Sequence, residues 1–162
     1  PAVALALNAT LIIQSATGER RVKASEFFIS LYRTAVQADE ILIGVEFPIA
    51  KPNQRFVFSE LARRKGDYAM AGMALALSLE GQTIQDVALA FMAMDDKPIL
   101  APRAMKALTG QTINPQTMSQ AQAGLDEDLQ PAGDLSANAA TKKHLSRVLL
   151  SRALIQAGAT HV

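Results

Sequence analysis

The sequence predicts an α+β fold, in which a small antiparallel β-sheet carries a layer of three helices on one face. Apolar and polar residues alternate with period two over much of residues 10–92, which is typical of strands. From residue 101 onward the apolar residues recur at helical spacing instead. Because the strands come first and the helices last, the two kinds of element are expected to form separate layers.

The composition excludes several classes of function. The 162 residues are 49% hydrophobic and 19% charged, so they can bury a core and do not form a disordered chain. A formal charge of +1 provides no field for binding nucleic acid or an anionic membrane surface. The lack of Cys excludes disulfides, thiolate catalysis and Cys-ligated metal clusters within this chain. The apolar run at residues 1–13 is too short to span a bilayer and has no basic leader, so neither membrane insertion nor a signal peptide is expected.

Short strands are expected in the first 48 residues. Residues 10–15 are rich in β-branched side chains, and the turn signal at Thr17-Gly18 predicts a hairpin with the residues that follow. Ser25 is expected to cap a short helical turn that begins with EFF at residues 26–28. The next strand ends at Pro48. Strict alternation along this strand is expected to place Ile41, Ile43 and Val45 on one face. The opposite face would carry Leu42, Gly44 and Glu46.

A strand with Phe56 and Phe58 on one face precedes a long predicted hairpin, whose turn is Glu80-Gly81-Gln82. Period two dominates residues 70–81, although their Ala, Met and Leu residues also favour a buried helix, which remains the alternative. The small residues of one parity imply that another layer, expected to be helical, approaches closely there. These residues are Gly72, Ala74, Ala76 and Ser78.

Three helices are predicted in the last third of the chain. Pro102 stands at a first helical position and Gly110 just past the end of that helix, while Asn114-Pro115 predicts a cap and start for the next. Its acidic end at residues 126–129 opposes the helix dipole and is expected to fray. The final helix, over residues 136–156, is expected to have one apolar face and to leave Lys142, Lys143 and Ser146 elsewhere. That face comprises Leu145, Val148, Leu149, Arg152 and Ile155.

Few motifs in the sequence indicate chemistry. The dinucleotide, P-loop and nucleophile-elbow patterns do not occur, and His144 and His161 lie too far apart in sequence to suggest a metal pair. The adjacent Asp95 and Asp96 are interpreted as a turn. The cationic corner at residues 63–68 (RRKGDY) combines three cations, a glycine and an aromatic residue. Such a corner can bind an anionic or planar ligand, or can be a solvated turn, and composition alone leaves both readings open.

Several segments, in order, resemble the FAD-binding medium subunit of molybdenum hydroxylases, a family that includes carbon monoxide dehydrogenase, xanthine dehydrogenase and aldehyde oxidoreductases. The segments are EFF (26–28), T-x4-DEIL-x3-EFP (34–48), F-x-ELARRKGDYAMAGMALAL (58–77), the A-P-R-A…L-G stretch (101–110) and HLSRVLLSRAL (144–154). The resemblance implies that residues 1–48 are the C-terminal part of the FAD-binding domain. It implies that residues 49–162 form the C-terminal domain of the flavoprotein. The family's two glycine motifs for pyrophosphate would precede Pro1, so the chain is expected to be the back half of a longer subunit.

The resemblance also implies a cofactor site. The family places a Leu of the DE-x-L segment against the flavin ring, which is Leu42 here, and the cationic corner near the reactive edge of the flavin. Arg64 and Asp67 are therefore expected to contact the flavin or to gate access to it. Many members carry a Lys about three residues before the first Arg of the corner, where this chain has Glu60. A carboxylate there would repel a flavin anion or a pyrophosphate.

The implied function is that of an FAD-containing subunit within a cytoplasmic, multi-subunit oxidoreductase. Its implied partners are a large subunit with the molybdenum cofactor and a small subunit with 2Fe-2S clusters, and neither a metal site nor a catalytic residue is expected in this chain. FAD binding by this chain alone is expected to be weak or absent, and the isolated chain is expected to be inactive. The alternative is a docking or oligomerisation module that binds no flavin.

Overall fold

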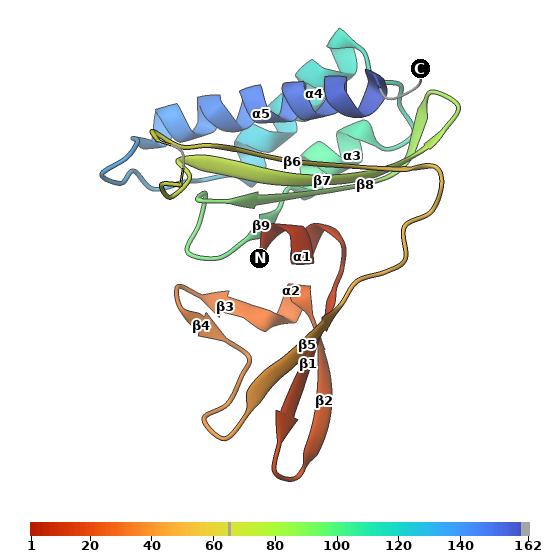
Figure 1. Cartoon of the computed structure of the whole chain (residues 1–162). Coiled ribbons are helices and arrows are strands. Elements are labelled where there is room, and N and C mark those ends of the chain that lie inside the picture. The colour runs from red at the N-terminus through yellow and green to blue at the C-terminus, as the bar shows by residue number, and fades with distance from the viewer. Residues whose placement is uncertain (65, 160–162) are drawn as a thin grey trace.

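The computed structural model describes residues 1–64 and 66–159, so Lys65 and His161 lie outside the described residues. It contains two β-sheet units, one above the other in Figure 1, that are joined by an irregular connection at residues 47–53. The predicted α+β fold is confirmed. None of the helices in the described part of the chain is long and apolar enough to cross a membrane.

The N-terminal unit is built on a three-stranded antiparallel sheet with the order β2-β1-β5. The predicted hairpin is confirmed, and Gly18 adopts a φ of 148° at its turn. Ser25 does not cap the short helix: it lies within the helix, whose N-cap position is Lys23. The elements of this unit are β1 (Thr10–Ser15), β2 (Gly18–Lys23), α2 (Ala24–Phe27), β3 (Phe28–Ser30), β4 (Arg33–Thr34) and β5 (Ile41–Glu46).

The C-terminal unit contains a four-stranded antiparallel sheet with the order β6-β7-β8-β9. Residues 71–80 form a strand, which excludes the alternative of a buried helix. Because β7 is buried on both faces, it carries helix-favouring apolar residues at nearly every position. The strands are β6 (Gln54–Leu61), β7 (Ala71–Glu80), β8 (Thr83–Met92) and β9 (Ile99–Leu100).

Three helices cover one face of this sheet, as predicted (Figure 1). The side chain of Asn114 accepts a hydrogen bond from the Thr117 amide at 2.9 Å, which confirms the predicted cap. Large apolar side chains of β7 and β8, such as Met73, Leu75 and Phe91, pack against the helices. The helices are α3 (Pro102–Leu108), α4 (Pro115–Asp128) and α5 (Ala139–Ala159).

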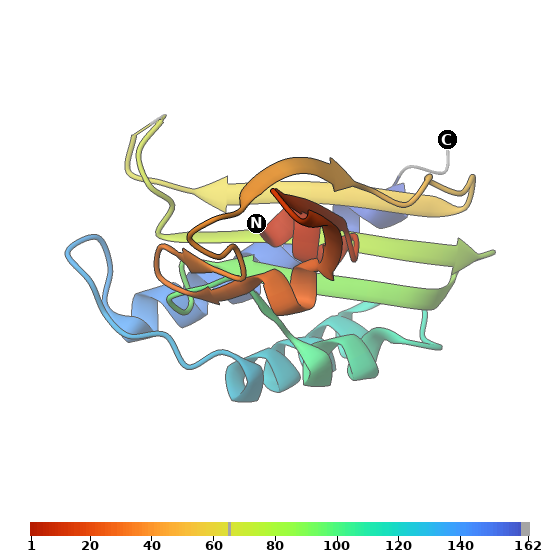
Figure 2. The same cartoon turned by 90° about the horizontal axis from the view of Figure 1, so that it is seen from below.

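The opposite face of the sheet carries the small residues, and a short N-terminal helix, α1 (Ala2–Ala6), packs against it (Figure 2). Leu5 and its neighbours form a small cluster with Ala74 and Ala90. A helix does approach the small-residue face closely, but it is the short α1 from the apolar N-terminal run, in which no helix was predicted, and the three-helix layer lies on the other face. The N-terminal run thus packs on the C-terminal sheet.

Two predictions about the helices are wrong, one about the buried face of α5 and one about the end of α4. Lys142 and Ser146 of α5 are buried, whereas Arg152 and Ile155 are exposed, because α5 packs through a different stripe of residues. The acidic end of α4 does not fray either, since Asp128 accepts hydrogen bonds from the backbone amides of the first turn of α3.

Candidate functional site

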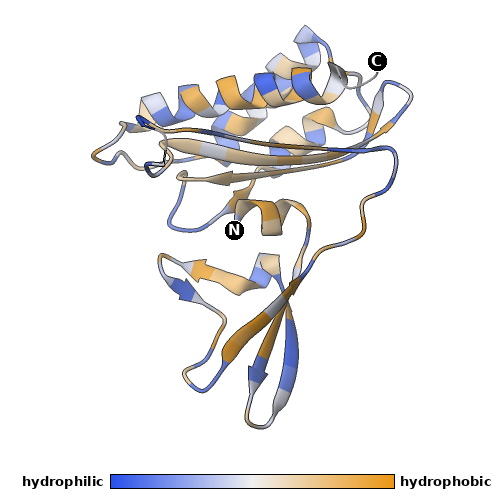
Figure 3. Ribbon diagram, viewed as in Figure 1, coloured by the Kyte–Doolittle hydropathy of each residue, from blue (hydrophilic) through white to orange (hydrophobic). Residues whose placement is uncertain are grey.

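An exposed apolar surface lies on β5, the strand that carries the predicted flavin contact. β5 is an edge strand of the described N-terminal sheet, and Figure 3 shows it as the most hydrophobic strand of that sheet. The exposed fractions of Ile41, Leu42 and Ile43 are 64%, 41% and 54%. An exposed apolar edge strand is rare in proteins unless another chain, segment or ligand covers it. The strand is therefore a candidate contact surface.

A register shift changes the direction of Leu42. Leu42 lies opposite Ile13 and Val45 lies opposite Leu11, while Ile43 has no partner in β1. Ile13 and Leu11 are both buried on the inner face of the sheet. Because directly paired residues point to the same face, this β-bulge brings Leu42 to the side of Val45. The strict alternation predicted for residues 41–46 is wrong at this point.

The segment before β5 is held by an ion pair that the sequence did not indicate. Arg20 of β2 donates to Glu40 through Nε at 2.6 Å and through Nη2 at 2.7 Å, and also to the carbonyl oxygen of Ala35. The hydrogen bond from Arg20, together with one from the Gln37 amide, lowers the pKa of Glu40 to about 2. Glu40 thereby fixes the start of β5. Arg20 lies on β2 and Glu40 in the loop before β5, and a pair so far apart in sequence carries no spacing signal, so only the structure reveals it.

The cationic corner connects β6 to β7, and Arg64 and Asp67 are both exposed there. They belong to one turn, in which the Asp67 amide donates to the carbonyl oxygen of Arg64 at 3.1 Å. Gly66 has a φ of 91°, a conformation that favours glycine. Two shallow depressions of about 290 and 280 Å³ adjoin the corner, and Glu60 lines the first of them. No residue of β5 is among the described residues that line these two depressions.

The structure thus brings Arg64 and Asp67 together but leaves Leu42 on the other sheet. Their common contact with a flavin stays a prediction. Asp95 lies in the predicted turn and accepts a hydrogen bond from the Asp96 amide, and His144 is exposed. Among the described residues, no group of three or more acidic or histidine side chains is placed to bind a metal ion.

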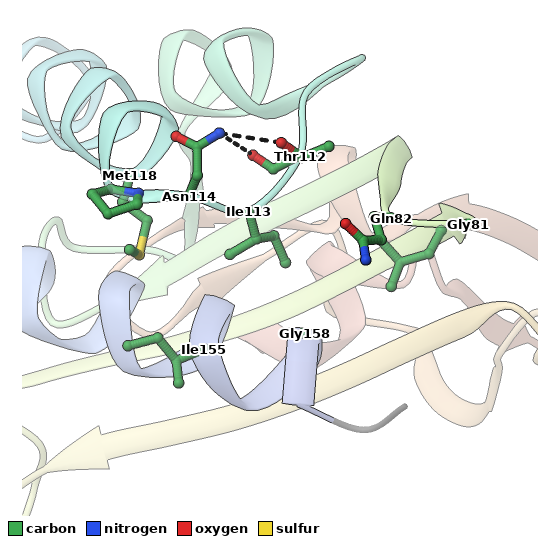
Figure 4. A pocket seen from close by; sticks show the side chains of 10 residues that line it. Gly81, Gln82, Thr112, Ile113, Asn114, Met118, Ile155 and Gly158 are labelled. Carbon is green, nitrogen blue, oxygen red and sulfur yellow. Dashed lines mark hydrogen bonds between the residues drawn. The ribbon is translucent and has the colours of Figure 1, made fainter. Parts of the chain in front are cut away.

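A larger cavity, of about 810 Å³, lies elsewhere, between the β7–β8 turn, the α3–α4 connection and the end of α5 (Figure 4). Its lining is apolar or uncharged, with Ile113, Met118 and Ile155 among the apolar side chains. The side chain of Asn114 is already bonded to Thr112 and to the amide of Thr117. The cavity is separated from the cationic corner by the length of β7, about 33 Å. No motif in the sequence indicated this cavity.

Comparisons with known proteins extend over nearly the whole chain. Residues 56–157 match the CO dehydrogenase flavoprotein C-terminal domain, and residues 1–50 match the FAD binding domain in molybdopterin dehydrogenase. The glyceraldehyde dehydrogenase medium chain of Sulfolobus acidocaldarius is 33% identical over 94% of this chain and 54% of its own length. The nicotine 6-hydroxylase medium subunit of Paenarthrobacter nicotinovorans is 33% identical over 98% of this chain and 56% of its own length.

Solved structures agree with these sequence matches. Carbon monoxide dehydrogenase from Hydrogenophaga pseudoflava superposes with a TM-score of 0.92 at 26% identity, over 97% of this chain and 55% of that one. Quinoline 2-oxidoreductase from Pseudomonas putida 86 superposes with a TM-score of 0.87 at 33% identity, over 96% of this chain and 54% of that one. The chain spans about half the length of the relatives that it matches. The resemblance inferred from the sequence is therefore confirmed: the chain belongs to the family of the CO dehydrogenase flavoprotein C-terminal domain and is related to the FAD-containing medium subunits of molybdenum hydroxylases.

Proposed function

We propose that this chain is the C-terminal portion of a flavoprotein subunit that carries FAD between the iron–sulfur clusters of a partner subunit and an external electron acceptor. The observation that carries the proposal is the apolar edge strand β5, which is exposed within the segment that matches an FAD binding domain. Exposing such an apolar surface to water is unfavourable in free energy. A bound isoalloxazine ring, together with the protein around it, would cover the surface. The bound flavin would supply the exchange of electrons between a one-electron and a two-electron partner.

The residues of this chain fit the ring of FAD and not its phosphates. Leu42 is 41% exposed and aliphatic, so it can lie against a flat ring and exclude water from it. A pyrophosphate is typically bound by a glycine-rich loop at the start of a helix. This chain has no such loop. The anchor for the phosphates is therefore expected in the remaining part of the subunit.

The cationic corner supplies charge in this proposal. The Arg64 guanidinium would stabilise negative charge that develops at the flavin edge, and Asp67 would limit which acceptors approach. Glu60, on the same side of the corner, would disfavour an anion and would bias the site toward a neutral or cationic acceptor. The distances from these groups to the flavin would be set by how the two sheet units enclose it.

The partners follow from the same proposal. We expect a large subunit with the molybdenum cofactor, which oxidises the substrate, and a small subunit that binds the 2Fe-2S clusters, in a complex that works in the cytoplasm. The lack of Cys in this chain is consistent with clusters bound by another subunit. Within the chain we assign residues 1–48 to the FAD-binding domain and residues 49–162 to the C-terminal domain.

FAD retention tests the proposal. The full-length subunit is incubated with FAD and desalted, and its absorbance near 450 nm is compared with that of this chain and of a Leu42→Asp variant of the subunit. We expect retention by the subunit, weak or no retention by the isolated chain, and reduced retention by the variant. Val3→Asp, another exposed apolar position that the proposal does not assign to the flavin, is the matched control. A full-length subunit without bound FAD would overturn the proposal and leave a docking module as the remaining function.

A further inference from the structure

The cationic corner is attached to the helical layer through Arg63. Its Nη2 atom donates a hydrogen bond of 2.9 Å to the carbonyl oxygen of Ser136, in the loop between α4 and α5. Ser136 and Arg63 also line the same depression of about 280 Å³, together with Asp67 and Tyr68. The position of the corner therefore depends on where the α4–α5 loop holds Ser136.

Asp134 holds Ser136 in place. Its Oδ1 atom accepts hydrogen bonds from the amides of Ser136 at 2.7 Å and of Ala137 at 2.9 Å, and its own amide donates to the carbonyl oxygen of Ala137 at 2.9 Å. An Asp that bonds to the amides two and three residues ahead stabilises a compact turn. The loop is thereby folded around one carboxylate.

Lys142 anchors this carboxylate to the core. Its Nζ atom lies 2.7 Å from Oδ2 of Asp134 and donates at 2.8 Å to the carbonyl oxygen of Ala93, at the end of β8. The Lys142 side chain is only 7% exposed, so these two oxygen atoms take the place of water around its ammonium group. The hydrogen bond from Lys142, with those from the two amides, lowers the pKa of Asp134 to about 2. The Asp134 carboxylate is therefore charged throughout the physiological range.

We propose that Asp134 and Lys142 are positioning residues for the cationic corner, acting through Ser136 and Arg63. One end of this connection is buried against α5 and β8, and the other end is an exposed turn whose backbone is otherwise held by its own short-range hydrogen bonds. Where the corner meets a flavin, which rests on the proposed function, the same connection sets the position of Arg64 and Asp67 relative to it.

Hydrogen exchange in the full-length subunit tests the connection without requiring a flavin. In the corner, the Asp67 amide donates to Arg64 and the Met70 amide donates to Leu61. Loss of one connecting hydrogen bond is expected to raise the exchange rate of peptides covering residues 62–70 by about fivefold. Asp134→Asn and Arg63→Met should each produce this increase. The double variant should show no further increase, because both changes break one connection.

Three further variants separate a positioning effect from a general loosening of the fold. Lys142→Arg keeps a cation beside Asp134 and should restore exchange to within twofold of the wild type, whereas Lys142→Met should not. Asp126→Asn removes another contact between α4 and α5, the ion pair in which Arg147 Nε donates to Asp126 at 2.7 Å. This control should leave the corner unchanged. Additive effects of Asp134→Asn and Arg63→Met, or an equal increase in the control, would overturn the proposal.

The visible circular dichroism of bound FAD tests the consequence for the flavin. Asp134→Asn and Arg63→Met should alter the spectrum and Asp126→Asn should not. An unchanged spectrum in a subunit that retains FAD would overturn the effect on the flavin and leave the proposed function standing. A subunit that retains no FAD would overturn the proposed function, and the exchange measurements would still decide the connection.

Discussion

At the scale of single residues, Asp128 shows how a distant carboxylate caps a helix. Its Oδ2 atom accepts hydrogen bonds from the amides of Arg103 at 2.8 Å and Ala104 at 3.0 Å, and the side chain is 1% exposed. The residue at the N-cap position of α3, Ala101, has no side-chain acceptor. Asp128 therefore takes the role of the missing cap from the end of another helix.

We expect Asp128→Ala to lower the free energy of unfolding by about 1–2 kcal/mol, because it leaves two amides of α3 without an acceptor. Urea denaturation followed by far-UV circular dichroism measures the change. The neighbouring Glu127→Ala removes only an exposed ion pair with Arg103 and should change the value by less than about 0.5 kcal/mol. Equal effects of the two substitutions would contradict the cap.

Glu40 and Asp134 each have a pKa lowered to about 2, so the free energy of unfolding is expected to decrease at acidic pH. A folded-state pKa below the unfolded value means that the stabilisation is fully present above the ordinary values of 4.5 and 3.8. It is lost as the pH falls toward 2. We expect the urea midpoint to decrease from pH 5 to pH 3, and to decrease less in a Glu40→Gln, Asp134→Asn double variant. A parallel decrease in both proteins would contradict the assignment.

At the scale of elements, the contact between α1 and the C-terminal sheet depends on small residues. Ala74 and Ala90 of the sheet meet Ala2, Leu5 and Ala6 of the helix, all of them buried. Ala74→Leu is expected to force the helix away and to destabilise the protein by about 1–3 kcal/mol. Thermal unfolding measures this effect. A change within about 0.5 kcal/mol would show that α1 does not need a close approach.

The same substitution on an exposed surface provides a matched control for this contact. Ala123 lies on the exposed side of α4, so Ala123→Leu adds the same atoms without overpacking a contact. It should leave the melting temperature within about 2 °C of the wild type.

At the scale of the whole molecule, the exposed apolar edge of β5 is expected to make the isolated chain self-associate. Ile43 is 54% exposed and has no partner in β1, so Ile43→Lys should increase the fraction of monomer without lowering the melting temperature. Sedimentation velocity over a range of concentrations measures the monomer fraction. Ile155, which is 58% exposed beside the large cavity, provides the control variant Ile155→Lys. Equal effects of both substitutions would contradict a specific role for β5.

Most of the fold was predicted from short-range signals. The turn at Gly18, the cap at Asn114 and the helix start at Pro102 each depend only on residues a few positions away in the sequence. The period-two alternation of residues 71–80 correctly predicted a strand, although these residues favour a helix by their intrinsic propensity. These signals fail where an element is shaped by a remote partner, as with the burial of Lys142 and the bulge that turns Leu42.

The candidate site was predicted only in its parts. The family resemblance selected Leu42, Arg64 and Asp67, and local chain geometry places the last two in one turn. The sequence contained no signal for the ion pair of Arg20 with Glu40, or for the connection from Lys142 to the corner, because their members lie far apart in sequence. Whether Leu42 and the corner meet one flavin remains a prediction.

The amino-acid sequence by itself determined the order of the main strands and helices, the turns, the cap at Asn114 and the family, because each depends on residue spacing or on ordered motifs. Only the tertiary structure decided which helix covers the small-residue face of the sheet, and how the cationic corner is held. Those two outcomes depend on which surfaces come into contact when the chain folds. A residue such as Lys142 or Asp128 acquires its role from atoms that the chain brings near it only after folding.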